Sequence, residues 1–186
     1  MYRHDMWQKI SFKLKRPYQK QILKMKKKNR EIIVMTSEAL VSALKHFEGC
    51  RLEAYRCPGG VWTIGYGHTH NVMKGDCYSQ EWAEETLRRD IEFVEREVLR
   101  LNVCKTQAQL DALVSLAFNI GIGRLKDSTL LRCIRRGATA DVITREWKRW
   151  NKAGGKVLKG LVARRQWEIL RYFQESTYLP FFNNGR

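Results

Sequence analysis

The stretch from residue 46 to residue 69, HFEGCRLEAYRCPGGVWTIGYGHT, most constrains the fold, because the hydrophobic period changes within it. Residues 38–47 have apolar side chains at helical spacing, and Gly49 follows as a stop signal. Beyond it, the pair Gly59-Gly60 marks a turn beside a segment rich in strand-forming residues. The sequence therefore predicts a helix that runs directly into a β-hairpin, with Glu48 at the junction.

After this hairpin the pattern is mostly helical. A long helix is predicted over residues 79–101, and a capping-box pattern at Thr106 and Gln109 opens an apolar helix that runs through Phe118 and ends at the glycines that follow. The residues expected to face inward on the long helix are Trp82, Leu87, Ile91, Val94 and Val98. Further helices are predicted near residues 127–136, 139–150 and 160–174. The predicted fold class is α+β, in which the long helix joins a small β-hairpin lobe to a larger helical lobe with a cleft between them.

Three polar residues mark the hairpin segment. Glu48 is followed nine residues later by Cys57 and six after that by Thr63, which opens the run TIGYGH. This segment resembles the catalytic segment of phage-type lysozymes, the endolysins of glycoside hydrolase family 24, where a glutamate, an aspartate and a threonine have this spacing. The resemblance covers roughly residues 36–174 and includes the run LVSLAFNIG at residues 113–121. Cys57 departs from the family pattern, because most members have aspartate there.

The resemblance implies hydrolysis of the β-1,4 bond between N-acetylmuramic acid and N-acetylglucosamine in bacterial peptidoglycan. Glu48 would be the general acid, while Thr63 and the residue at position 57 would hold and activate a water molecule. Arg164 or Arg165 would orient the carboxyl of Glu48. By the same resemblance, the residues expected to bind substrate are Gly67, Phe118 and Ser128. No metal or other cofactor is expected, and the five cysteines include no C-x-x-C pair.

Cys57 has two interpretations. A buried cysteine is most often a small hydrophobic residue. A thiolate, in contrast, would replace the carboxylate as an acceptor and a negative charge, and for this its pKa must lie below the usual value of about 8.5. Arg51 and Arg56 are neighbours that would lower it. We favour the interpretation in which Cys57 takes the role of the aspartate.

Other hypotheses concern the same segment. Glu53 or Asp76 would be substitutes for the missing carboxylate, although neither matches the motif. If the chain doubles back, a disulfide between Cys50 and Cys57 would mask the thiol and make activity depend on reduction. His68, at the end of the TIGYGH run, is interpreted as a structural hydrogen-bonding residue rather than a catalytic one.

The first 34 residues differ from the rest in charge. They hold eleven lysines and arginines against Asp5 and Glu31, whereas the whole chain has a net charge of +16. We interpret residues 1–34 as a basic extension that is disordered or is not natively translated, with Met35 as the native start. Residues 35–175 would form the lysozyme-like catalytic domain, and residues 176–186 a tail without a clear period.

Other classes of function remain open at this stage. A lytic transglycosylase would leave anhydro-muramic ends, and a relative impaired by Cys57 would bind the wall without cleaving it. A nucleic-acid binder would depend on the basic extension alone, so no dedicated nucleic-acid partner is expected. The expected partners are peptidoglycan and a separate holin-type protein that permeabilises the membrane, since no secretory signal or spanning segment is recognised. A monomer held in the host cytoplasm until release is expected.

Overall fold

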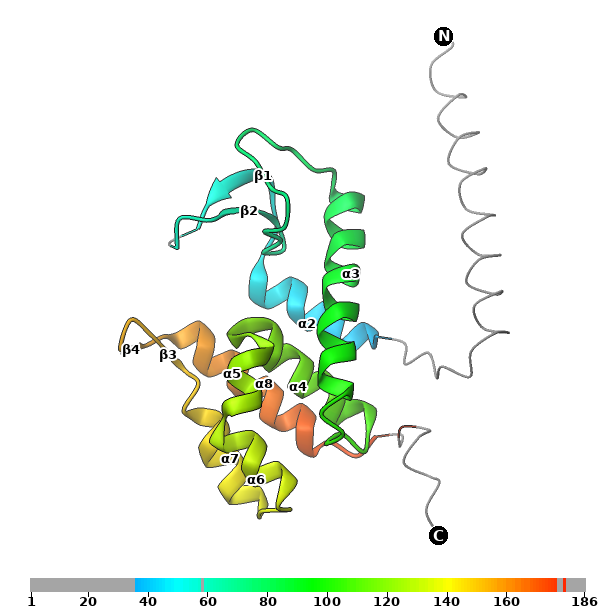
Figure 1. Cartoon of the computed structure of the whole chain (residues 1–186), viewed down its shortest axis with the longest axis vertical. Helices are drawn as coiled ribbons and strands as arrows, with labels where there is room; N and C mark the ends of the chain where they lie inside the picture. Colours follow the sequence, from blue (N-terminus) through cyan, green and yellow to red (C-terminus); the bar gives the residue numbers. More distant parts are fainter. Residues whose placement is uncertain (1–35, 58, 177–178, 180–186) are drawn as a thin grey trace, which may run out of the picture. The chain divides into compact units, whose positions relative to one another are not determined.

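The structure is a computed structural model that describes residues 36–57, 59–176 and 179 (Figure 1). Contacts divide the chain between Val34 and Met35, and every described residue belongs to the second unit. The predictions made for residues 1–34, for Met35 as a start and for most of the C-terminal tail lie outside the described residues.

The helix α2 (Glu38–Glu48) runs into the strand β1 (Arg51–Arg56), as the change of period predicted. Its N-cap is Ser37, whose hydroxyl accepts a hydrogen bond from the backbone N–H of Leu40 at 3.1 Å. Gly49 ends the helix with a φ of +65°, a backbone conformation that side chains other than glycine rarely adopt. Glu48 is therefore the last residue of a helix and lies just before a sharp turn.

The strand β1 lies between two neighbouring segments. On one edge it pairs in antiparallel register with β2 (Trp62–Gly65), so that Tyr55 lies opposite Thr63. On the other edge the chain returns after β2, where Tyr78 N–H donates to the carbonyl of Leu52 at 2.8 Å. The free edge of the hairpin is thereby covered by the chain's own backbone.

The long helix α3 (Gln80–Leu99) has 20 residues and contacts both β2 and the helical lobe, as predicted. Trp82 was expected to face inward, and this was wrong, because its side chain is 45% exposed. The residue that packs in this first turn is Ala83, because a Cβ added to Gly65 of β2 would lie 3.4 Å from the Cβ of Ala83. Trp82, one position away, packs instead on the edge of Tyr78.

The helical lobe is built around α4 (Gln107–Ile120), which packs against α2, α3 and α8 (Lys159–Phe173). Thr106 caps α4, and Gly121 ends it as predicted. The remaining elements are α5 (Ile122–Asp127), α6 (Thr129–Arg135), α7 (Ala140–Lys148), β3 (Lys152–Ala153) and β4 (Lys156–Val157). The helix α5 and the hairpin of β3 and β4 were not predicted. The α+β class with a small hairpin lobe and a larger helical lobe is confirmed.

Within the described ranges, no helix is both long enough and apolar enough to cross a bilayer.

Candidate active site

The carboxyl of Glu48 contacts the guanidinium of Arg164 on α8. Arg164 Nη1 donates to Glu48 Oε1 at 2.6 Å, and the two residues lie 116 positions apart in the chain. The side chain of Arg164 is 3% exposed, whereas that of Glu48 is 22% exposed. Glu48 is thus partly open to solvent, and a buried arginine fixes the direction of its carboxyl.

Arg164 is held in place by a buried carboxylate, Glu168. Arg164 Nε lies 3.3 Å from Glu168 Oε1, and Nη2 donates to the backbone carbonyl of Ser115 at 2.9 Å. Ser115 Oγ and Trp147 Nε1 also donate to the Glu168 carboxylate, each at 2.8 Å. Burial raises the pKa of Glu168, while the charges of Arg165 and Arg164 oppose that rise. Glu168 and the carbonyl of Ser115 therefore hold Arg164 in the orientation in which it contacts Glu48.

Arg165 does not contact Glu48. Its Nη2 donates to Glu168 at 2.9 Å and to Asn119 Oδ1 at 3.1 Å, while Nη1 donates to the carbonyl of Trp150 at 3.1 Å. Burial lowers its pKa from the usual arginine value. The sequence left open which arginine would orient Glu48, and the geometry assigns this contact to Arg164.

Gly67 lies against the other oxygen of Glu48. A Cβ added to Gly67 would lie 3.8 Å from Glu48 Oε2, and the φ of Gly67 is +93°, so a side chain here would strain the backbone. Within the described residues, Oε2 accepts no hydrogen bond, whereas Oε1 is engaged by Arg164. The two oxygens of Glu48 thus differ, since Oε1 contacts Arg164 and Oε2 lies beside Gly67.

Cys57 and Thr63 lie together on the β1–β2 hairpin. Cys57 N–H donates to the carbonyl of Val61 at 3.0 Å, and the Thr63 hydroxyl donates to the same carbonyl at 3.1 Å. The pKa of Cys57 is lowered, first by hydrogen bonding from the backbone of Val61 and then from that of Gly59, with a smaller contribution from the Thr63 side chain. The expected lowering thus has a different cause, since backbone groups rather than Arg51 or Arg56 produce it.

The hypothesis of a disulfide between Cys50 and Cys57 does not agree with this conformation. Both cysteines are free, and the whole of β1 lies between them. A strand rises about 3.3 Å per residue, which places the Cα atoms of Cys50 and Cys57 roughly 20 Å apart. A disulfide requires Cα atoms within about 7 Å of each other, so the bridge is excluded while β1 is formed.

The remaining substrate-binding predictions fall on α4 and α6. Phe118 is half-buried near the end of α4. Ser128 is 6% exposed and is the N-cap of α6, where its hydroxyl donates to the carbonyl of Leu125 and accepts from Leu131 N–H. Substrate contact by either residue stays a prediction, and for Ser128 the structural role is already evident.

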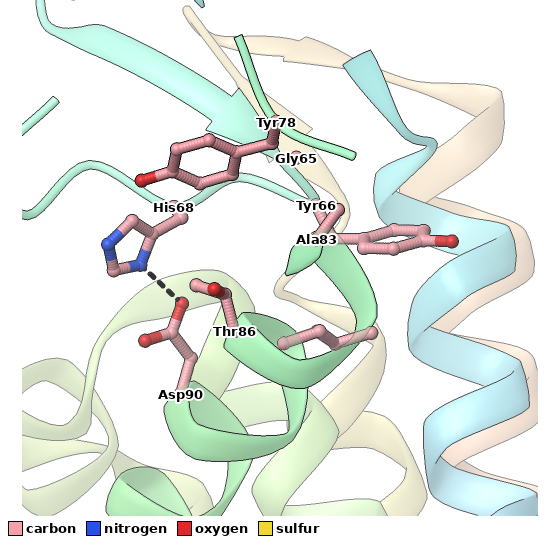
Figure 2. Close-up of a pocket in the computed structure, with 8 residues that line it drawn as sticks. Gly65, Tyr66, His68, Tyr78, Ala83, Thr86 and Asp90 are labelled. Atoms are coloured by element: carbon pink, nitrogen blue, oxygen red, sulfur yellow. Dashed lines mark hydrogen bonds and ion pairs between the residues drawn. The ribbon is translucent and has the colours of Figure 1, made fainter. Parts of the chain in front are cut away.

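His68 ties the hairpin to α3 rather than joining Glu48. Its Nδ1 lies 2.7 Å from Asp90 Oδ2 (Figure 2). Its Nε2 lies 3.0 Å from the carbonyl oxygen of His70. These groups border a shallow depression between the hairpin and α3, which Thr86 and Tyr78 also line. None of the predicted catalytic residues lines it. The two contacts agree with the interpretation of His68 as a structural hydrogen-bonding residue.

Sequence reasoning missed Glu168 and Asp90. Glu168 accepts a hydrogen bond from Ser115, 53 positions away, and Asp90 contacts His68, 22 positions away, so neither contact is marked by a local motif. The only signal for Glu168 in the sequence is its position four residues after Arg164, the spacing of neighbours on one helix face. In the described part of the chain, no group of His, Cys, Asp or Glu side chains is arranged to hold a metal ion.

The chain is similar to known phage proteins. The family model for phage lysozyme matches residues 45–168. An endolysin of Acyrthosiphon pisum secondary endosymbiont phage 1 is 44% identical over 137 residues, which are 71% of this chain and 93% of that protein. An endolysin of Bacillus phage B103 is 45% identical over 136 residues, which are 71% of this chain but only 51% of that protein.

Solved structures show the same relation. The muramidase domain of SpmX from Asticaccaulis excentricus is 35% identical and superposes with a TM-score of 0.69, covering 75% of this chain and 98% of that domain. The fold and the family match thus define a glycoside hydrolase of the lysozyme type. The chain belongs to the phage lysozyme family, and its function is that of an endolysin.

Proposed function

We propose that the protein hydrolyses the β-1,4 bond between N-acetylmuramic acid and N-acetylglucosamine in peptidoglycan. The observation that carries the proposal is the contact between Glu48 and Arg164, which leaves Oε2 as the oxygen able to carry a proton. Cleavage of a glycosidic bond needs a proton on the leaving oxygen and a nucleophile or a water molecule on the other face of the sugar. Glu48 supplies the first requirement.

Cys57 and Thr63 supply the second requirement in this proposal. As a thiolate, Cys57 accepts a proton from the attacking water. The Thr63 hydroxyl, which donates its proton to the carbonyl of Val61, positions that water by accepting a hydrogen bond from it. The lowered pKa of Cys57 supports this role, because it increases the thiolate fraction at neutral pH. Gly67 lets the glycan approach Glu48 closely, because it presents only backbone there.

The test is the set of fragments released from purified peptidoglycan by the wild-type protein and by Glu48→Gln. Reducing-end muropeptides are expected from the wild type, with a loss of about 10²- to 10⁴-fold in the variant, the usual contribution of a positioned general acid. Anhydro-muramic ends would instead assign a transglycosylase. Binding to the wall without any product from the wild type would assign a non-catalytic relative, with Cys57 as the cause.

The proposal also includes a route of release from the cell and an oligomeric state. Release to the wall through a separate holin-type protein predicts that lysis of an expressing host requires co-expression of such a protein. A monomeric state predicts a mass of 21.9 kDa for the whole chain in solution, measurable by light scattering.

A further inference from the structure

The turn that carries Gly67 is closed by its own backbone. Ile64 N–H donates to the carbonyl of His68, and His68 N–H donates to the carbonyl of Ile64, each at 2.9 Å. Because these two bonds join the ends of the turn, the residues between them move together. Tyr66 lies between those ends, directly before Gly67, and is 7% exposed. A contact that anchors the Tyr66 side chain therefore also fixes where Gly67 lies.

The Tyr66 hydroxyl is held by Gln80, the first residue of α3. Gln80 Nε2 donates to Tyr66 Oη at 2.9 Å. In Figure 2 the ring of Tyr66 points away from His68 and Asp90, so this contact is separate from the one that ties His68 to α3. The turn is thus attached to α3 at two places, and Gln80 makes the attachment next to Gly67.

Gln80 is also connected to the chain on both sides of Glu48. Its Oε1 lies 3.8 Å from Cys50 Sγ, in the segment that follows Glu48. Its Nε2 donates to Glu84 Oε1 at 3.0 Å, and the same oxygen lies 2.8 Å from Nζ of Lys45, in the last turn of α2. The amide thus uses both of its N–H donors and its oxygen, and it joins the end of α2 to the Tyr66 turn.

We propose that Gln80 is a positioning residue that acts through Tyr66 and sets the separation between Gly67 and Oε2 of Glu48. A Cβ added to Gly67 would lie 3.8 Å from that oxygen, so the backbone of Gly67 borders the space in which the leaving oxygen of the glycan meets the acid. This assignment rests on the proposed function, in which Glu48 is the general acid. The hydrogen bond to Tyr66 also contributes to the stability of the fold, so the two roles have to be distinguished by measurement.

The test measures kcat and KM for cleavage of soluble glycan strands from peptidoglycan. Tyr66→Phe keeps the buried ring and removes only the hydroxyl, and Gln80→Leu removes the amide at an exposed position. Each variant is expected to lower kcat about 10-fold and to leave KM within about 2-fold, because the acid is misplaced while the rest of the binding surface is kept. Gln166→Leu, at an exposed position on α8, is the matched control and should keep the kcat of the wild type.

The double variant Tyr66→Phe/Gln80→Leu tests whether the two residues act through one hydrogen bond. It should lose no more kcat than either single variant, because both substitutions remove the same contact. Losses that multiply would show that the two residues act separately and would overturn the proposal. So would an unchanged kcat at a temperature at which circular dichroism shows every variant to be folded, because that is the result of a purely stabilising role.

Exchange of the His68 amide proton, followed by NMR, separates this proposal from the proposed function. That proton closes the turn, so its exchange should be faster in Tyr66→Phe and Gln80→Leu than in the wild type and in Gln166→Leu. This result would support the anchoring of the turn by Gln80 even if the wild type cleaves no glycan. Equal exchange in all four proteins would contradict it.

Discussion

The two halves of the site are built differently. Glu48 is positioned by Arg164 and Glu168, whose side chains are 3% and 0% exposed and lie in a network of charged hydrogen bonds. Cys57 and Thr63 depend on a short hairpin turn and on the carbonyl of Val61. The acid half is therefore coupled to the stability of the helical lobe, whereas the hairpin half can change its chemistry without unfolding the protein. We therefore expect the fold to tolerate either a cysteine or an aspartate at position 57.

The largest effect on stability is expected for Glu168→Gln. The substitution removes the only carboxylate that contacts both Arg164 and Arg165 within the described chain, which leaves buried Arg165 without a counter-charge and Arg164 with that of Glu48 alone. Breaking such a buried pair costs about 3–5 kcal/mol. Chemical denaturation measures the free energy of unfolding. Glu175→Gln, at an exposed position, is the control and should change it by less than about 0.5 kcal/mol; similar losses in both variants would contradict the network.

Variants of the two arginines in this network should distinguish an effect on stability from an effect on catalysis. Arg164→Lys and Arg165→Lys each lose buried hydrogen bonds and should each destabilise the fold by about 1–3 kcal/mol. Only Arg164 contacts Glu48, so only its variant should lower kcat strongly, by about 100-fold, which is typical of a misplaced catalytic group. Steady-state kinetics and chemical denaturation of both variants check these expectations. Equal losses of kcat would show that Arg164 does not orient Glu48.

A second buried carboxylate sharpens the comparison, because Glu95 on α3 forms no ion pair with an arginine among the described residues. It accepts a hydrogen bond from Thr36 at 2.8 Å, and burial raises its pKa to about 7, with Asp111 and Glu92 adding to the rise and Arg96 opposing it. The folded protein thus binds a proton at Glu95 more tightly than the unfolded chain does. The stabilisation that this proton contributes is fully present below about pH 4 and is lost as the pH rises towards 7.

Glu95→Gln should remove this pH dependence and stabilise the protein at pH 8 by about 1–3 kcal/mol relative to wild type. Unfolding experiments at pH 5 and pH 8 measure the difference. A variant whose stability changes between these two pH values as much as that of the wild type would show that Glu95 is not the titrating group.

The smallest effect on stability is expected in the hairpin half. Cys57→Ser should change the free energy of unfolding by less than about 0.5 kcal/mol, because the side chain lies at a partly exposed turn. Activity should nevertheless fall at least about 10-fold, because a hydroxyl does not ionise near neutral pH. Denaturation and peptidoglycan turnover on the same preparation check this, and parallel losses would show that Cys57 is a packing residue.

The sequence was most informative where structure is local. The change of period at residues 46–69, the cap at Thr106 and the stop at Gly121 each depend on neighbouring residues, and all three were predicted correctly. Trp82 was misplaced because helical spacing does not show which neighbour reaches the first turn of α3. Glu168 was missed because its partners are as far as 53 positions away.

The pH dependence of peptidoglycan cleavage by the wild type, Cys57→Asp and Cys57→Ala tests the central claim most directly. If the Cys57 thiolate acts in the aspartate's place, the activity of the wild type falls with decreasing pH through a thiol pKa below its usual value of about 8.5. Cys57→Asp should remain active with this limb moved to about pH 4, and Cys57→Ala should lose it together with most of the activity. An alanine variant with the activity and pH profile of the wild type would contradict the account.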